Sequence, residues 1–410
     1  MMGTKMRISL ITITYPPEIG GAAHLIHELA LGLKEKGHQV CVLTGYPSYN
    51  IKDVPPQYRR GSRMTEEIDG VTVRRIRFVN LPRESIAARG FQHFMYGLWL
   101  SWLWLRSPKA DRALVFSPPL PLPWMIVLLG RLRRPLAAVN IQDLFPREAV
   151  ELGVLKNRLL IGLFEAMERQ VYRLAAGVTV HSPGNREHVI SRGGRPEKVR
   201  VIYNWVNTDQ IRPGPRMNDF ARQHDLSGRF VVSYAGTMGW AQDMGTIVDC
   251  ARRLSSRPEI LFLMVGDGVE KEKAVSAAKS LGLANILWLP MQPLAVYPQI
   301  LAASDVSMIN LHPELRTPVV PSKLLSIMSA GRPVVASLPA ESDARAIIAD
   351  AGCGVCVEAG NGAALADAIL NMQADPAAAE AMGRRGREYV ESHFSRSICI
   401  DQMERFLMEL

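Results

Sequence analysis

The sequence predicts an α/β protein built from two Rossmann-like, doubly wound domains that face each other across a cleft. The chain has 410 residues, which is more than one hydrophobic core usually organises. Short apolar segments alternate with helical ones, as in parallel sheets covered on both faces. This alternation restarts after a Pro- and Gly-rich linker at 212–215. We therefore expect an N-terminal domain over 1–210, a C-terminal domain over 211–394, and a helix over 395–410 that packs back on the N-terminal domain.

The first half contains a series of short segments with the apolar character of strands. A helix follows the first of them, opening at Gly20-Gly21 and running to about Lys36, where Gly37 ends it. The segment 71–78 alternates apolar and basic residues, which indicates a strand with one wetter face. The predicted strands are Arg7–Thr14, Gln39–Thr44, Val71–Phe78, Arg112–Phe116, Leu136–Ile141, Gly177–His181 and Tyr203–Asn207.

The second half repeats the pattern from residue 230 onward. A turn over Gly236–Gly239 separates its first strand from a helix over Asp243–Leu254. The chain closes with an amphipathic segment, Ser395–Leu410, which predicts the C-terminal helix. The predicted strands are Phe230–Ala235, Ile260–Val265, Ile286–Leu289, Val306–Asn310 and Pro333–Ala336.

Glycine-rich turns follow the first strand of each half, at Gly20-Gly21 and at Gly236–Gly239. At the carboxyl ends of parallel strands, such turns let backbone N–H groups and helix N-termini face an anion. Either turn could also be a tight connection with no ligand. Neither contains G-x-G-x-x-G, and the chain has no G-x-x-x-x-G-K-[ST]. Dinucleotide and Walker-type ATP sites therefore lack their signals.

The segment 319–335 (VVPSKLLSIMSAGRPVV) is the most informative part of the chain. Pro321 and Ser322 provide a helix start and Gly331 a helix stop. Lys323 falls in the first turn, where the helix dipole disfavours a cation. A bound diphosphate would reverse that penalty. The alternative is a solvated surface lysine.

Seven segments also occur in a characteristic order and spacing: Tyr15–Ala22 (YPPEIGGA), Ile141–Pro146 (IQDLFP), Lys198–Asn207 (KVRVIYNWVN), Tyr234–Gly236 (YAG), Val265–Gly268 (VGDG), Ala303–Val306 (ASDV) and the Pro-Ser-Lys segment. Together they resemble glycosyltransferase family 4, the retaining transferases of GT-B fold, over essentially the whole chain. The resemblance is strongest to the subgroup that assembles bacterial surface polysaccharides on lipid carriers.

The chain departs from the family pattern at several positions. The two glutamates that many members carry eight residues apart fall at Pro318 and Ser326. An arginine and a lysine that often hold the diphosphate fall at Thr237 and Gln242, and a common histidine falls at Gln142. We interpret this pattern as a variant donor site.

The resemblance implies transfer of a sugar from a UDP- or GDP-sugar to a hydroxyl of a lipid-linked saccharide. The departing diphosphate gains negative charge, so preorganised donors around it should be the largest catalytic contribution. Asp143 and Gln142, at the end of a first-domain strand, could orient the sugar or the acceptor hydroxyl; no general base can be named. The expected donor-binding residues are Gly20, Gly21, Gly236, Thr237, Gln242, Gly266, Asp267, Pro321, Ser322 and Lys323. No D-x-D occurs, so we expect neither a metal nor a cofactor.

Charge is distributed unevenly between the halves. Residues 1–210 hold 29 Lys+Arg against 17 Asp+Glu, a net +12, whereas 211–410 carry a net −3. Two apolar runs in the basic half, 91–105 and 120–130, are shorter than the ~20 residues of a membrane span. Tryptophan beside arginine suits a lipid headgroup boundary. The predicted membrane-contact residues are Trp99, Trp102, Trp104, Arg106, Arg131, Arg133 and Arg134. Alternatively, both runs belong to the core.

These patterns predict a cytoplasmic protein, without a signal peptide, lying on the inner face of the plasma membrane. Two other functions stay open. One is a nucleotide-sugar 2-epimerase of the same fold, which would need acid–base groups that the sequence does not identify. The other is a non-catalytic polyanion-binding protein. Because the arginines are scattered and follow no nucleic-acid-binding motif, no nucleic-acid partner is expected.

Overall fold

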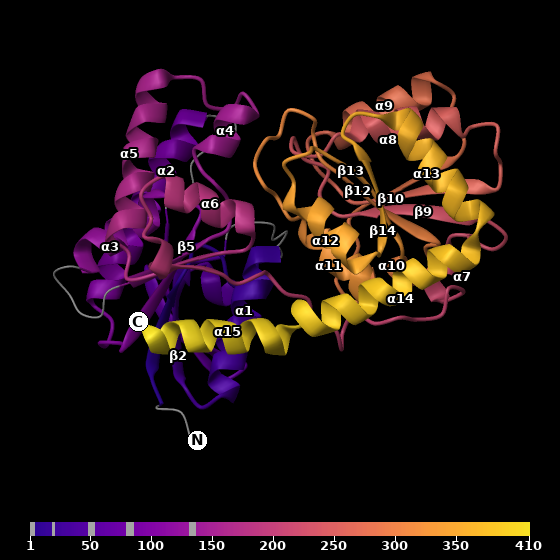
Figure 1. The fold of residues 1–410 in the computed structure, drawn as a ribbon. Coiled ribbons are helices and arrows are strands. Elements are labelled where there is room, and N and C mark those ends of the chain that lie inside the picture. Colours follow the sequence, from indigo (N-terminus) through magenta and orange to yellow (C-terminus); the bar gives the residue numbers. More distant parts are fainter. Residues whose placement is uncertain (1–4, 19–20, 48–53, 79–85, 131–136) are drawn as a thin grey trace. The chain divides into compact units, whose positions relative to one another are not determined.

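The computed structural model describes residues 5–18, 21–47, 54–78, 86–130 and 137–410, and the chain divides into two compact units (Figure 1). Unit 1 comprises Met1–Asn204 and Ser397–Leu410, and unit 2 comprises Trp205–Arg396. The chain therefore leaves unit 1 before residue 210 and returns to it just after residue 394. Each unit is an open α/β sheet with helices packed on it.

Unit 1 is organised around an eight-stranded sheet in the order β3-β4-β2-β1-β5-β6-β7-β8. All neighbouring strands in it are parallel except the β3–β4 pair, which is antiparallel. Its interior strands are almost completely buried, which explains their continuous apolar sequences. The strands are β1 (Arg7–Ile11), β2 (Gln39–Gly45), β3 (Arg63–Ile68), β4 (Val71–Ile76), β5 (Arg112–Ser117), β6 (Ala137–Ile141), β7 (Val178–Val180) and β8 (Val199–Val201).

In unit 1, two strand predictions differ from the structure. The edge strand β3 was not predicted, because its sequence is polar; it is joined to β4 by a tight turn in which Asp69 and Gly70 both have positive φ (49° and 73°). The predicted strand Tyr203–Asn207 is wrong: the last strand of the sheet is β8. Only Val206 forms a bridge, to Ser395, beside the two points where the chain passes between units.

Helices cover the unit 1 sheet, and the C-terminal helix α15 is one of them (Figure 1). Ile400 packs over Gly32, where a Cβ would lie 2.4 Å from Ile400 Cδ1. Glu404 accepts from Lys36 Nζ at 3.0 Å and pairs with His38 Nε2 at 2.8 Å. The helices are α1 (Gly21–Glu35), α2 (Ile86–Leu105), α3 (Pro121–Gly130), α4 (Arg147–Glu151), α5 (Arg158–Leu174), α6 (Pro183–Ser191) and α15 (Arg396–Glu409).

The apolar runs 91–105 and 120–130 form α2 and α3, which pack on each other and on the sheet. Trp104 is 2% exposed and belongs to the core, so its predicted membrane contact is wrong. Trp99 is 39% exposed, and the guanidinium of Arg106 lies 5.4 Å from the Trp102 ring centroid. Arg131, Arg133 and Arg134 lie outside the described residues. Among the helices that the structure describes, none has the length and apolarity needed to cross a membrane.

Unit 2 is organised around a six-stranded parallel sheet in the order β11-β10-β9-β12-β13-β14. The strands are β9 (Phe230–Ala235), β10 (Ile260–Val265), β11 (Ile286–Leu289), β12 (Val306–Asn310), β13 (Val334–Leu338) and β14 (Gly354–Glu358). The helices are α7 (Asp219–Gln223), α8 (Met244–Arg253), α9 (Lys271–Ser280), α10 (Tyr297–Ala302), α11 (Ser322–Ser329), α12 (Asp343–Ala351), α13 (Gly362–Ala374) and α14 (Pro376–His393).

Candidate functional site

The glycine turns after β9 and β10 pack directly on each other at the carboxyl edge of the unit 2 sheet. A Cβ at Gly266 would lie 1.9 Å from the Gly236 carbonyl oxygen, and one at Gly268 would lie 2.2 Å from that of Met238. Only glycine permits such an approach. Gly266, a predicted donor-binding residue, therefore owes its lack of a side chain to contact between the two loops.

Hydrogen bonds join the same two loops. The Gly236 N–H donates to the Val265 carbonyl at 2.8 Å, and the Met238 N–H donates to the Asp267 carbonyl at 3.0 Å. The prediction that the Gly236 N–H is offered to a ligand is therefore wrong, because this donor already has a backbone partner. These hydrogen bonds instead hold the turn in place, so that side chains such as that of Lys323 can pack on it.

The carboxylate of Asp267, another predicted donor-binding group, braces its own loop. It accepts from the Met291 N–H at 2.8 Å and from Lys271 Nζ at 3.0 Å. Lys271 Nζ also donates to the carbonyls of Gly266 at 2.7 Å and Leu289 at 3.1 Å. These bonds hold the turn that supports Gly236.

Lys323, in the first turn of α11, lies across Gly236. A Cβ at Gly236 would be 2.3 Å from Lys323 Cε. Lys323 Nζ lies 5.1 Å from the ring centroid of Tyr234, within the range of a cation–π contact. The Tyr234 hydroxyl in turn donates to the carbonyl of Thr237. Desolvation lowers the pKa of the Lys323 ammonium to about 8. Because its side chain lies across Gly236 and beside the Tyr234 ring and is half-buried, the alternative of a solvated surface lysine is wrong.

The remaining predicted donor residues of unit 2 lie in the turn after β9 and at the start of α11. Gln242 accepts the Gly239 N–H through Oε1 at 3.0 Å, which closes the turn after β9. Pro321 is the N-cap of α11, and Ser322, its first residue, is exposed. The first N–H groups of a helix have no intrahelical acceptor. Together with Lys323, the start of α11 can therefore hold an anion.

Sequence reasoning did not assign a role to Tyr234, although it lies in one of the seven characteristic segments. Its side chain is buried, at 1% exposure, while its ring still contacts the ammonium of Lys323. In the sequence, Tyr234 could have been recognised as an aromatic residue near the carboxyl end of a predicted strand, two positions before Gly236.

A second polar group lies at the carboxyl edge of unit 1, where β6 ends before Gln142 and Asp143. Asn204 Nδ2 donates to Gln142 Oε1 at 2.8 Å, and Gln142 Nε2 donates to Asn140 Oδ1 at 2.5 Å. Asn140 Nδ2 donates to Thr179 Oγ1 at 2.9 Å. Gln142 Nε2 also donates to Asn204 Oδ1 at 3.2 Å, so the two amides pair reciprocally and the orientation of the Gln142 side chain is fixed. Asn204 was not assigned a role from the sequence.

Asp143 is exposed and lies in the same turn as Glu148. Glu148 Oε1 accepts the Leu144 N–H at 3.0 Å. Desolvation, and secondly the negative charge of Asp143, raises the pKa of Glu148 to about 8. Burial at the start of α4 therefore favours the protonated form of Glu148, a property that the sequence did not reveal.

The glycine turn after β1 is only partly described. Gly21 is the first residue of α1, and Gly20 lies outside the described residues. The anion-binding role of this turn therefore stays a prediction. In the part of the chain that the structure describes, no cluster of three or more His, Cys, Asp or Glu residues is placed to hold a metal ion.

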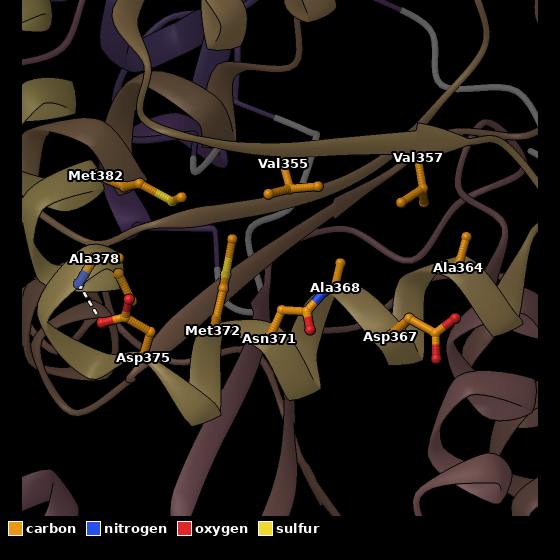
Figure 2. Close-up of a pocket in the computed structure, with 11 residues that line it drawn as sticks. Val355, Val357, Ala364, Asp367, Ala368, Asn371, Met372, Asp375, Ala378 and Met382 are labelled. Carbon is orange, nitrogen blue, oxygen red and sulfur yellow. Dashed lines mark hydrogen bonds between the residues drawn. The ribbon is translucent and has the colours of Figure 1, made fainter.

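A separate pocket of about 420 Å³ lies against β14, α13 and α14 (Figure 2). Apolar side chains such as Val355, Met372 and Met382 form its walls, and none of its lining residues, all within the described ranges, is basic. Asp375, at its end, accepts the Ala378 N–H at 3.0 Å and caps α14. The pocket lacks the positive charge that a phosphate ligand would need.

Both halves of the chain match known family models. Residues 20–205 match the Glycosyl transferase 4-like domain, and residues 229–375 match Glycosyl transferases group 1. The chain is 25% identical over 363 residues to WcaI of Escherichia coli strain K12, a glycosyl transferase named for colanic acid biosynthesis; the match covers 86% of this chain and 88% of WcaI.

Solved structures share the fold at lower sequence identity. Sucrose-phosphate synthase from Thermosynechococcus elongatus superposes with a TM-score of 0.78 at 18% identity, covering 99% of both chains. Anabaena Alr3699/HepE, solved in complex with UDP-glucose, superposes with a TM-score of 0.75 at 17% identity, covering 99% of this chain and 100% of that one. Two parallel-sheet α/β units with these structural neighbours establish a GT-B fold.

Proposed function

Because the chain belongs to the family 4 glycosyltransferases, we propose that it moves a sugar from a nucleoside-diphosphate sugar to a hydroxyl of a lipid-linked saccharide, with retention at the anomeric carbon. The process it serves is bacterial surface polysaccharide synthesis. Its likeness to WcaI supports this assignment. The UDP-glucose complex of HepE supports a nucleotide sugar as donor, with a UDP- or GDP-sugar as the class to test.

The observation that carries the proposal is the placement of Lys323 over Gly236 at the start of α11. A diphosphate there would meet a cation and the unpaired N–H groups of a helix N-terminus. As the bond to the sugar breaks, negative charge grows on the diphosphate. Groups already fixed in place stabilise that charge without reorganisation. Lys323, Ser322 and Gln242 are our candidates for this task.

On unit 1, we assign Gln142 and Asp143 to orienting the sugar or the acceptor hydroxyl. Asn140 and Asn204 hold the Gln142 amide at both ends. A carboxylate such as Asp143 can accept a hydrogen bond from a sugar hydroxyl. No residue is assigned as nucleophile or general base.

Two measurements test the proposal. The first is a thermal-shift screen of the full chain with UDP-, GDP- and ADP-sugars, in which a ligand at 100 times Kd adds about 2.7 kcal/mol of stability. The second incubates the protein and the stabilising donor, radiolabelled in its sugar, with bacterial membranes that supply lipid-linked acceptors. We expect label in the lipid-extractable fraction. Stabilisation by none of the donors would contradict the proposal.

The same assay separates the two alternatives. A 2-epimerase would release nucleotide from the donor when membranes are left out, and the lipid fraction would stay unlabelled. A non-catalytic polyanion-binding protein would bind none of the nucleotide sugars but would shift random DNA in a salt-sensitive way.

A further inference from the structure

Helix α5 begins in solvent and ends in the core of unit 1. Its first turns expose three leucines: Leu159 is 85% exposed, and Leu160 and Leu163 are also on the surface. Its second half buries Met167 and Val171. The two ends of α5 therefore lie in opposite environments, one in solvent and one in the core.

The exposed end is a formed helix. Asn157 is its N-cap, and Asn157 Oδ1 accepts the N–H groups of Leu159 at 2.9 Å and Leu160 at 3.2 Å. Residues three and four apart are neighbours on a helix surface, so Leu159, Leu160 and Leu163 form one apolar patch. We call these three residues the leucine patch.

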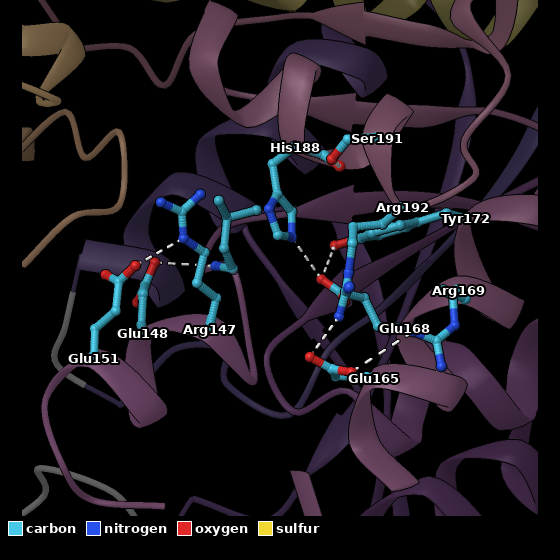
Figure 3. Close-up of polar contacts among 11 residues, drawn as sticks. Arg147, Glu148, Glu151, Glu165, Glu168, Arg169, Tyr172, His188, Ser191 and Arg192 are labelled. Atoms are coloured by element: carbon cyan, nitrogen blue, oxygen red, sulfur yellow. Dashed lines mark hydrogen bonds and ion pairs between the residues drawn. The ribbon is translucent and has the colours of Figure 1, made fainter. Parts of the chain in front are cut away.

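The buried end of α5 is clamped to α6 by a charged cluster (Figure 3). Glu168, 1% exposed, accepts from Tyr172 at 3.0 Å and pairs with His188 Nε2 at 2.8 Å. Arg192 Nε donates to its other oxygen at 3.2 Å, and Arg192 also pairs with Glu165 at 2.8 Å. This clamp fixes the direction in which the leucine patch projects.

Three neighbouring leucines exposed to water are unfavourable, and transfer to an apolar environment would stabilise them. The leucine patch lies at an exposed helix end, which suits insertion into the apolar region of a lipid bilayer. Exposed Lys156 and Arg158 flank it directly. Leucines bordered by basic residues match the boundary between the acyl chains and the headgroups of an anionic bilayer.

Helix α2 continues the apolar surface. The rings of Phe94 on α2 and Phe164 on α5 have centroids 6.3 Å apart. Next to this contact along α2, Leu98 and Trp99 are exposed. The basic half of the chain, with its net +12, therefore exposes apolar residues on both α2 and α5, which meet at the contact between Phe94 and Phe164.

We infer that the leucine patch of α5 inserts into the interfacial layer of an anionic bilayer and is the main membrane anchor of this chain. This deepens the proposed function, whose acceptor is lipid-linked, and rests on it for the choice of partner. It also moves the anchor from the tryptophans of α2, expected from the sequence, to α5.

The test is flotation of the full chain with vesicles of phosphatidylethanolamine and 30% phosphatidylglycerol at low salt. The variant L159S/L160S/L163S is compared with wild type. The matched control, V269S/L281S/L294S, changes three exposed apolar residues of unit 2. We expect wild type and control to float, and the α5 variant to lose at least 90% of its bound fraction. Far-UV circular dichroism and the thermal shift with the nucleotide sugar confirm that each variant is folded.

Flotation of the α5 variant to the wild-type extent would overturn the inference, as would wild-type protein that stays at the bottom of the gradient. Self-association of wild type through this surface, lost in the α5 variant and without flotation, would likewise overturn it in favour of a second copy as partner. Donor binding is measured separately on the same proteins, so a failure of the membrane inference is distinguishable from a failure of the proposed function.

Discussion

Lys323 Nζ lies 5.1 Å from the ring centroid of Tyr234, and the aliphatic part of the same lysine crosses Gly236. A strand end, a glycine turn and a helix start thus place one partly desolvated ammonium at the edge of the unit 2 sheet. The glycine is small enough for the lysine to cross it, and the tyrosine ring lies beneath the charge. The following predictions test this arrangement and its surroundings.

Replacing Lys323 by alanine should lower turnover by roughly 10²–10³, the scale for losing one preorganised donor. Far-UV circular dichroism should be unchanged, because the ammonium makes no contribution to the core. Steady-state transfer rates measure the effect, and Lys279→Ala, on the exposed face of α9, is the control. Near-native turnover in the Lys323 variant would remove this residue from the mechanism.

Replacing Gly236 by alanine should displace Lys323, because the new Cβ would lie 2.3 Å from Lys323 Cε. We expect weaker nucleotide binding, to about the level of Lys323→Ala. The double variant should bind nucleotide no more weakly than Gly236→Ala alone, since both changes remove the same contact and the strain of alanine at the positive φ of Gly236 is common to the two proteins. Additive losses in calorimetric titrations would show that Gly236 acts in some other way. Gly90→Ala, where a Cβ meets open space, is the control.

Nucleotide binding should weaken as the pH rises above 8. The pKa of Lys323 in the free protein is about 8, and a diphosphate favours the charged form, so binding raises this pKa. Above pH 8 nucleotide binding is coupled to the uptake of one proton from solvent by the lysine, so Kd should rise by up to about tenfold per pH unit. The phosphates are fully ionised there, since the second phosphate pKa is about 6. Calorimetric titrations between pH 7.5 and 9.5 measure the change in Kd. For Lys323→Arg, Kd should not change with pH over this range. A wild-type profile as flat as that of the arginine variant would contradict the prediction.

Replacing Glu168 by alanine should destabilise unit 1 by about 3 kcal/mol, the scale for removing one partner of a buried ion pair. His188 and Arg192 would keep their positions but lose a buried acceptor. Urea denaturation reports the change, and Glu165→Ala, which is partly exposed, should cost less than 1 kcal/mol. Equal costs for both variants would show that the clamp adds nothing to the fold.

Transfer should not require a divalent cation. Metal-dependent transferases hold their cation with closely spaced aspartates, and this sequence contains no D-x-D. We expect the same rate in EDTA as in magnesium or manganese. Loss of activity in EDTA that is restored by either metal would overturn this expectation.

The buried strands and Lys323 were predictable from the sequence because each has a local signal. Val231–Val232 and Ile260–Val265 are continuous apolar runs, and Lys323 follows a helix-starting Pro-Ser pair. The edge strand β3 was missed because its sequence, RMTEEI, is mostly polar and resembles a loop. Trp104 was misplaced because composition alone does not tell which face of α2 packs on the sheet.

The hydrogen-bonded polar pairs could not be predicted from local sequence patterns, for a different reason. Asn204 reaches Gln142 across 62 positions of sequence, and the Gly236 N–H is taken by a strand that follows it in the chain. Such pairings depend on strand order, which a single sequence does not encode locally. The seven characteristic segments therefore predict the regions of the candidate site, whereas the contacts of each residue within them require the structure.

The most direct test of the central claim is calorimetric titration of the full chain with UDP and, separately, GDP, for wild type and Lys323→Ala. The account predicts that wild type binds one of the two nucleoside diphosphates, and that Lys323→Ala binds the same nucleotide at least tenfold more weakly. Equal dissociation constants for the two proteins, or binding of neither nucleotide by wild type, would contradict the assignment of this edge of unit 2 as the diphosphate site.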